Sequence, residues 1–114
     1  MKDDRLYLEH IIECIGKIEA YVVEGKESFL QDPKTQDAVL RNLQILTEST
    51  KRLSGSLKDT HPEVDWPEVA RFRNVLVHDY LGIDLLRVWD IVQGDLPDLK
   101  RKVGPILKGL PQKT

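Results

Sequence analysis

Apolar side chains recur at three- and four-residue steps along most of the chain, which is the period of an amphipathic helix. Two such segments fill the first half of the sequence, from about Asp3 to Glu24 and from about Pro33 to Ser54. The positions that keep this spacing are Leu8, Ile11, Ile12, Ile15, Ile18 and Val22, and then Val39, Leu43, Leu46, Thr50, Leu53 and Leu57. We therefore predict two long helices, each with one face turned toward a core.

The stretches that follow these two helices are richer in polar and turn-forming residues. We expect the stretch from Glu24 to Pro33 to be a connection with a short helical turn at residues 28–31. Gly55 is expected to end the second helix, and residues 58–63 are expected to form a polar loop.

A third helix is predicted to begin at Asp65. The Asp65 carboxylate can cap the helix, and Glu68 three residues later completes a capping-box pattern. Pro67 is tolerated in the first turn, where its missing N–H would have no helical partner. The helix is expected to end near Tyr80, with Gly82 as its left-handed stop.

A fourth helix is predicted from Ile83 or Asp84 to the region of Ile106. Pro97 lies inside it and cannot donate to the carbonyl four residues earlier, so we expect a kink there. No segment alternates with a period of two, which predicts an all-α protein, most simply an up-down bundle of four long helices. We assign residues 1–108 to one domain and residues 109–114 to a flexible tail.

The charge balance argues against a protein that binds nucleic acid over its whole surface. Lys and Arg number 17 against 19 Asp and Glu, for a net charge of −2, whereas nonspecific phosphate binding needs a basic surface. A local basic cleft is compatible with this balance. The single cysteine, Cys14, excludes an intrachain disulfide and is interpreted as a small buried apolar residue. No apolar run resembles a signal peptide or a membrane span, so we expect a cytoplasmic protein without membrane association.

The stretch from Arg71 to Tyr80 gathers two arginines, an amide, an imidazole, a carboxylate and a phenol around one helix end. At about 100° per residue, Asn74 and His78 share a helix face, whereas Arg73 and His78 are about 140° apart. One straight helix therefore cannot bring Arg73 and His78 to the same small group. A site that uses both needs the helix to end near His78, or a second copy of the helix across a dimer.

These residue types suit the cleavage of a phosphodiester. A histidine titrates near neutral pH, so His78 can take a proton from a 2′-hydroxyl or give one to the leaving oxygen. Arg73 can supply a permanent positive charge to the phosphate oxygens of the transition state. Asn74 can orient the imidazole or bind phosphate, and Arg71 is a further candidate for RNA binding.

Spacing alone does not establish such a site, because an arginine and a histidine five residues apart on a helix often occur by chance. Arg71 is equally compatible with a plain surface cation, and Tyr80 with a half-buried amphipathic anchor. The basic pairs and runs at residues 51–52 and 100–102 are interpreted as solvated helix faces.

The sequence Arg73-Asn74-Val75-Leu76-Val77-His78-Asp79-Tyr80 resembles the R-x-x-x-x-H-x-Y motif of HepT-type HEPN proteins, the toxin half of a prokaryotic toxin–antitoxin pair. The likeness covers roughly residues 3–107. Outside the motif it is carried by residues 37–43, 66–70, 81–84, 88–91 and 94–99.

This resemblance implies a HEPN fold, a dimerising bundle of four or five helices. It implies metal-independent RNA cleavage, without a cofactor, in a cleft at the interface of a homodimer. There the arginine and histidine of both chains would meet, which would resolve the angular separation of Arg73 and His78. Carried over by position, Arg73 stabilises phosphate charge, His78 is the acid and base, and Asn74 is the polar residue that commonly follows the arginine.

The resemblance also implies a protein partner, a minimal nucleotidyltransferase antitoxin of the MntA type. Tyr80 matches the tyrosine that accepts AMP from ATP and becomes O-AMP-tyrosine. A bulky negative group two residues from His78 would repel RNA phosphates and fill the cleft. One departure is Thr47, in a segment where relatives often have a Gly-Glu-Ala run, and this changes the expected approach of the second helix to its neighbour.

Three functions therefore remain open at the level of sequence. The first is an endoribonuclease toxin of a type VII-like pair. The second is a non-catalytic HEPN module that forms a complex with a minimal nucleotidyltransferase, which the negative net charge slightly favours. The third is a structural helical dimer, which would give the motif no purpose.

Overall fold

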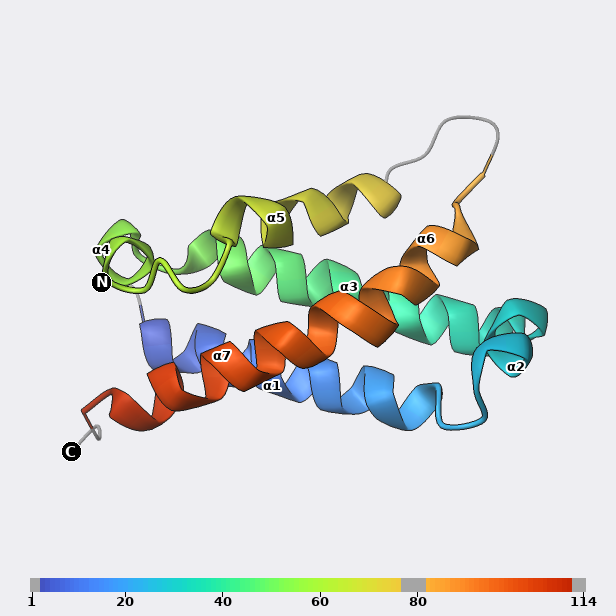
Figure 1. Ribbon diagram of the computed structural model, residues 1–114, viewed down its shortest axis with the longest axis horizontal. Helices are drawn as coiled ribbons and strands as arrows, with labels where there is room; N and C mark the ends of the chain where they lie inside the picture. Colours follow the sequence, from blue (N-terminus) through green and yellow to red (C-terminus); the bar gives the residue numbers. More distant parts are fainter. Residues whose placement is uncertain (1–2, 77–81, 112–114) are drawn as a thin grey trace.

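The fold is an antiparallel bundle of helices, shown in Figure 1. The structure is a computed structural model, and it describes residues 3–76 and 82–111. The elements are α1 (Asp4–Tyr21), α2 (Lys26–Gln31), α3 (Pro33–Arg52), α4 (Gly55–Thr60), α5 (Trp66–Arg71), the 3-10 helix η1 (Phe72–Val75), α6 (Leu85–Asp90), the π-helix η2 (Ile91–Asp95) and α7 (Leu96–Gly109). No strand occurs within these ranges, so the predicted all-α class and up-down arrangement are confirmed.

Helices α1 and α3 form the antiparallel pair that the apolar spacing predicts. The buried apolar residues are Leu8, Ile11, Cys14, Ile15 and Ile18 on α1, and Val39, Leu43 and Leu46 on α3. Each helix begins at an aspartate whose side chain accepts a backbone N–H, Asp3 for α1 and Asp32 for α3. Cys14 is buried as expected, and burial raises the pKa of its thiol.

The predicted polar loop at residues 58–63 is wrong in its first half, because Lys58 to Thr60 belong to helix α4. Ser54 explains the difference, since its hydroxyl caps α4 by accepting the N–H of Leu57. Ser54 also donates to the Asp4 carboxylate through its backbone N–H at 2.8 Å and its hydroxyl at 2.6 Å. This contact ties the end of α3 to the start of α1, and Gly55 begins a helix instead of ending one.

The third predicted helix is only partly α-helical. Asp65 caps α5 by accepting the N–H of Glu68 at 3.0 Å, and Pro67 lies in the first turn, as predicted. The α-helix ends at Arg71, however, and the chain continues as the 3-10 helix η1. Gly82 has a φ of 97°, which confirms its left-handed conformation.

The fourth predicted helix is divided by a π-helix immediately before Pro97. The N–H of Leu96 reaches back to the carbonyl of Ile91, one residue further than in an α-helix. Because Pro97 has no N–H to donate, the wider turn absorbs the break in the ladder. The structure thus shows a π-helix that joins α6 to α7 in this region, and the predicted kink at Pro97 stays a prediction.

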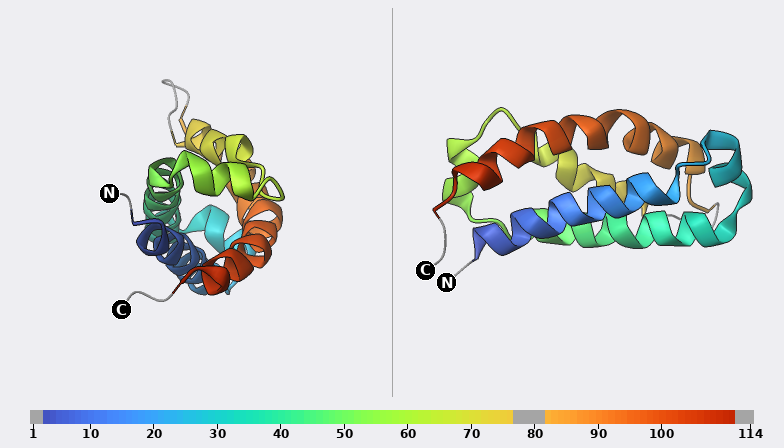
Figure 2. Two further views of the ribbon diagram at one scale, coloured as in Figure 1. Left: turned by 90° about the vertical axis from the view of Figure 1, so that its left-hand side faces the viewer. Right: turned by 90° about the horizontal axis from the view of Figure 1, so that it is seen from below.

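Helices α1, α3, α5 and α7 surround one core, as the left view of Figure 2 shows along the bundle axis. At one end Phe29 of α2 packs on Trp89 of α6, with ring centroids 5.5 Å apart. At the other end, where both termini lie (Figure 1), the Arg5 guanidinium donates to the carbonyls of Leu110 at 2.8 Å and Pro111 at 3.1 Å. Residues 112–114 of the predicted tail lie outside the described ranges.

Candidate active site

The first half of the motif lies where α5 passes into η1. Arg73 and Asn74 are exposed residues of η1, and Phe72 anchors this segment in the core with only 2% of its surface exposed. The N–H of Leu76 donates to the carbonyl of Arg73 at 3.0 Å, three residues back. A 3-10 helix turns by about 120° per residue, so Arg73 and Leu76 point the same way.

The angle of about 140° between Arg73 and His78 assumed one α-helix through both residues. That assumption is wrong, because the α-helical geometry ends at Arg71. His78, Asp79 and Tyr80 lie outside the described residues. Their predicted roles therefore rest on sequence.

A groove runs beside Arg73, between α3 and the α5–η1 segment. Two adjoining cavities of about 200 and 400 Å³ make up this groove, and Thr47, Glu48 and Arg73 line both of them. The smaller cavity is completed by Gln44 and Leu76, and the larger by Thr50, Lys51, Lys58, Trp66 and Ala70. We call the two cavities together the α3–α5 groove.

Positive side chains outnumber negative ones in the α3–α5 groove. Among the described residues that line it, Arg73, Lys51 and Lys58 are positive and Glu48 alone is negative. Within residues 3–76 and 82–111, no carboxylate forms an ion pair with the Arg73 guanidinium. The groove can therefore attract an anion in a protein whose net charge is −2.

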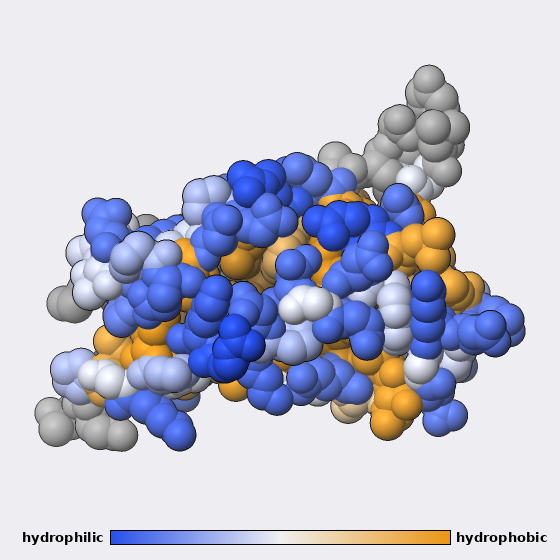
Figure 3. Space-filling view, in the orientation of Figure 1, coloured by the Kyte–Doolittle hydropathy of each residue, from blue (hydrophilic) through white to orange (hydrophobic). Residues whose placement is uncertain are grey.

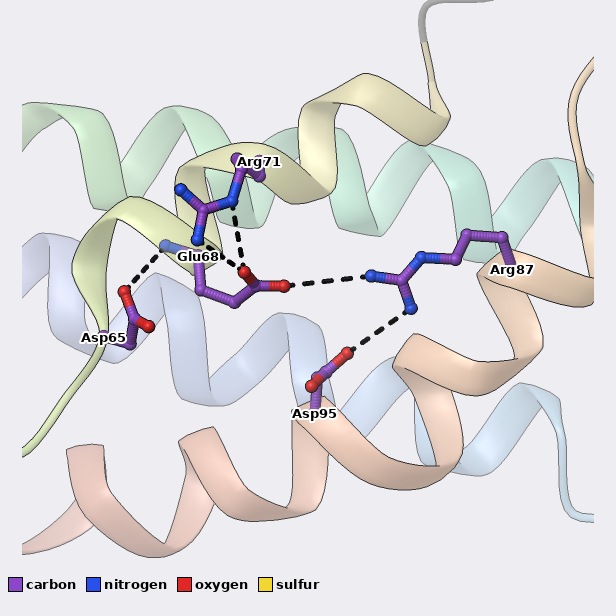
Figure 4. A network of polar contacts seen from close by, with 5 residues as sticks. All are labelled: Asp65, Glu68, Arg71, Arg87 and Asp95. Carbon is purple, nitrogen blue, oxygen red and sulfur yellow. Dashed lines mark hydrogen bonds and ion pairs between the residues drawn. The ribbon is translucent and has the colours of Figure 1, made fainter.

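Arg71 lies on the other side of α5. Its guanidinium donates to one carboxylate oxygen of Glu68, from Nη2 at 2.6 Å and from Nε at 3.1 Å. The hydrogen bond to Glu68 raises the pKa of the Arg71 guanidinium above its usual value. Figure 4 shows Glu68 between Arg71 and Arg87, and the Arg87 guanidinium pointing toward both Glu68 and Asp95. The structure thus places Arg71 in a carboxylate network and Arg73 in the groove, and a role of Arg71 in RNA binding stays a prediction.

This network joins the two helical segments that flank residues 77–81. The Arg87 guanidinium lies 3.8 Å from Glu68 on α5 and 3.9 Å from Asp95 on η2. Asp95 is partly buried, and desolvation raises the pKa of its carboxyl group, although Arg87 opposes the shift. The network can fix α5 relative to the start of α7 while leaving the α3–α5 groove open.

Several groove residues were not expected from the sequence. Lys51 was interpreted as part of a solvated helix face and Lys58 as part of a loop, whereas the two line the same cavity. Thr47 was noted as a departure from the family pattern. It is 6% exposed, and its hydroxyl donates to the carbonyl of Gln44 at 2.9 Å. The spacing of Thr47 and Lys51, one helical turn apart and on the same side as Gln44, was the available signal.

The chain is similar to one protein family over most of its length. A profile of the family described as "Ribonuclease HepT-like" matches residues 11–106. The chain belongs to the HepT-like ribonuclease family. No solved structure matches it.

Three relatives illustrate the extent of the match. A protein of Thermococcus cleftensis named "Probable ribonuclease HepT" is 44% identical over 90% of this chain and 94% of its own length. A protein of Caldanaerobacter subterraneus described as a putative RNase is 36% identical over 95% of this chain and 97% of its own length. A protein of Methanocaldococcus jannaschii, also described as a putative RNase, is 34% identical over 96% of this chain and 91% of its own length. The recognised family is confirmed.

None of the helices in the described ranges is long and apolar enough to cross a membrane. The face that carries α5 and α7 is mainly hydrophilic, with apolar residues showing between the helices (Figure 3).

Proposed function

We propose that this HepT-like protein is a metal-independent endoribonuclease. Its membership of a ribonuclease family, together with Arg73 and His78 at the motif spacing, is the observation that carries the proposal. The unpaired position of Arg73 in a basic groove, among the described residues, supports the same role, because a phosphate-binding arginine must be open to the substrate.

In the proposed reaction, the 2′-oxygen of the ribose attacks the adjacent phosphorus and the 5′-oxygen of the next nucleotide leaves. His78 takes the proton of the 2′-hydroxyl or gives one to the leaving oxygen. Arg73 stabilises the added negative charge on the phosphate oxygens. Because a single chain carries one arginine and one histidine of this kind, a homodimer would bring two sets to a shared cleft.

The test is cleavage of a single-stranded RNA in the presence of EDTA by the wild-type protein and by Arg73→Ala and His78→Ala. We expect the wild-type protein to cleave and each substitution to reduce the rate by about 10²-fold or more. Undiminished cleavage by both variants would remove these residues from the mechanism. Loss of wild-type cleavage in EDTA would refute metal independence.

We further propose that the protein is the toxin of a type VII-like toxin–antitoxin pair. An MntA-like nucleotidyltransferase would neutralise it by transferring AMP to Tyr80. The phenol oxygen would attack the α-phosphorus of ATP, and pyrophosphate would leave. The added negative charge lies two residues from His78 in sequence and would repel an RNA phosphate.

Intact mass spectrometry tests this regulation directly. After incubation with the nucleotidyltransferase and ATP, the mass should rise by one or more AMP groups, and Tyr80→Phe should abolish the increase. A stable complex with no change in mass would instead support neutralisation by binding.

The second candidate function is a non-catalytic module that forms a complex with the nucleotidyltransferase. The observation that favours it is the negative net charge, together with the carboxylates that surround Arg71 and Arg87. This function predicts a tight complex, no RNA cleavage, and no growth arrest when the protein is expressed without its partner.

A further inference from the structure

The α3–α5 groove continues well beyond Arg73. Gln44 lines one end and Lys51 the other, seven residues apart on α3, which corresponds to about 10 Å along the helix axis. The groove is therefore longer than a single phosphate needs.

The cations of the groove come from three different elements. Lys51 belongs to the last turn of α3, Lys58 to α4 and Arg73 to η1. Lys51 is exposed and Lys58 is half-buried, and both line the larger cavity with Arg73. Such a row of separate positive charges suits a polyanion better than it suits one small anion.

The remaining donors near the lysine end already serve the protein backbone. The Thr47 hydroxyl donates to Gln44 and the Thr50 hydroxyl donates to Leu46, at 2.9 and 3.0 Å. The Trp66 indole N–H donates to the carbonyl of His61 at 3.0 Å. Lys51 and Lys58 add positive charge at this end of the groove, and lysine ammonium groups recognise phosphates without reading bases.

We propose that the α3–α5 groove binds the backbone of a single RNA strand, with Lys51 and Lys58 contacting phosphates next to the one held by Arg73. This inference rests on the proposed ribonuclease function and names the substrate contacts beyond the cleavage motif. Gln44, at the opposite end, carries the one amide side chain among the described residues that line the groove, and a base could be read there.

Binding is measured by fluorescence anisotropy with a labelled single-stranded RNA, in the His78→Ala background so that the RNA stays intact. The test protein carries Lys51→Ala and Lys58→Ala. The matched control carries Lys26→Ala and Lys34→Ala, which remove the same charge from exposed residues at the other end of the bundle. Thermal unfolding followed by circular dichroism verifies that each protein is folded.

We expect the groove variant to bind at least about tenfold more weakly at low salt and the control to bind like its parent. The slope of log K against log salt should become shallower by about 1.4, for two lost contacts to a single strand. The loss should be similar for RNAs of different sequence. Equal affinity and slope in the groove and control variants would overturn the proposal.

Further outcomes separate this proposal from the alternatives. In the protein with His78 intact, the Lys51→Ala/Lys58→Ala double substitution should raise KM for RNA with kcat nearly unchanged. Arg73→Ala, by contrast, should lower kcat. If cleavage depends on Arg73 but the lysine variant has a normal KM, the ribonuclease proposal stands and the proposed RNA binding in the α3–α5 groove is refuted. A change in oligomer mass with unchanged RNA affinity would overturn it too, by assigning the groove to contact between two copies. Failure of the wild-type protein to cleave would refute the ribonuclease alone, since the anisotropy comparison does not depend on cleavage.

Discussion

The two sides of helix α5 carry opposite chemistry. On the side toward α3, the groove is lined by Arg73, Lys51 and Lys58 against Glu48. On the side toward α7, a smaller cavity of about 50 Å³ is lined by four carboxylates and one lysine, namely Asp65, Glu68, Asp95, Asp98 and Lys102. Although the net charge of the protein is only −2, the two sides of the short helix α5 differ in charge, one basic and the other acidic.

The difference lies in pairing as much as in charge. On the acidic side, Arg71 and Arg87 are held by Glu68 and Asp95, and Lys102 lies 3.0 Å from Asp98. An arginine in such a network is less available to a ligand, because a substrate must displace its carboxylate partner. Arg71 and Arg73 are two residues apart in sequence but have different surroundings. Arg73 is open to a substrate in the groove, whereas Arg71 is held by its carboxylate partner.

The largest expected effect comes from the residue that holds the two sides together. Phe72 is 2% exposed and connects α5 to η1, so Phe72→Ala should destabilise the protein by about 3–5 kcal/mol. Urea denaturation measures the loss. Phe72→Leu, which keeps most of the apolar volume, should lose clearly less. A Phe72→Ala protein as stable as wild type would show that η1 does not depend on this anchor.

The next effect sharpens the contrast between the two arginines. Arg73→Ala should reduce kcat for RNA cleavage by about 10²–10³-fold, as expected for a lost transition-state charge. Arg71→Ala should reduce kcat much less, because Glu68 already engages the Arg71 guanidinium. Equal losses in the two variants would break the comparison between the sides of α5.

A smaller effect is expected for the ion pairs of Arg87. Arg87→Met keeps the apolar stem but removes the charge between Glu68 and Asp95, and should destabilise by about 0.5–1 kcal/mol at low salt. The matched control is Lys17→Met, because the Lys17–Glu13 ion pair is exposed and lies within helix α1 alone. Its cost should be about 0.3–0.5 kcal/mol. If high salt does not reduce the effect of Arg87→Met, charge pairing is not its cause.

The smallest effect concerns two carboxylates of the acidic side with opposite pKa shifts. Burial raises the pKa of the Asp95 carboxyl group above 3.8 in the folded state. The free energy of unfolding therefore decreases as the pH rises from 3.8 through this higher pKa, because the buried carboxyl group is harder to ionise than in the unfolded chain. The hydrogen bond from Lys102 lowers the pKa of Asp98 below 3.8, so its contribution is present at neutral pH and is lost as the pH falls through 3.8 to that lower value.

Urea denaturation of Asp95→Asn and Asp98→Asn tests these directions. At pH 7 the first variant should be slightly more stable than wild type and the second slightly less stable. Both differences should shrink as the pH is lowered below the respective windows. The same sign for both variants would contradict the assigned causes.

The sequence predicted the framework well and its irregular parts less well. The apolar spacing predicted α1 and α3, and the Asp65, Pro67 and Glu68 pattern predicted the start of α5. Helix α4 was missed because its cap, Ser54, is also held by Asp4, 50 residues away. The change from α to 3-10 geometry at Phe72 was missed for a related reason, since nothing in the local sequence marks where the core requires that turn.

The candidate site divides in the same way. Arg73 was identified from its motif, whereas Lys51 and Lys58 were not, because their own surroundings in the sequence resemble any solvated helix face. Thr47 was noted in the sequence only as a departure from the family pattern, and the structure shows that it lines both cavities of the groove.

The sequence by itself determined that the chain is a helical bundle and that Arg73 and His78 are five residues apart, because helical period and residue spacing are local properties of the chain. Only the tertiary structure decided that Arg73 faces a basic groove while Arg71 faces carboxylates. That outcome depends on which helices pack on each side of α5. It brings together side chains of α3, α4 and η1 that are far apart in sequence, and no local pattern records their proximity.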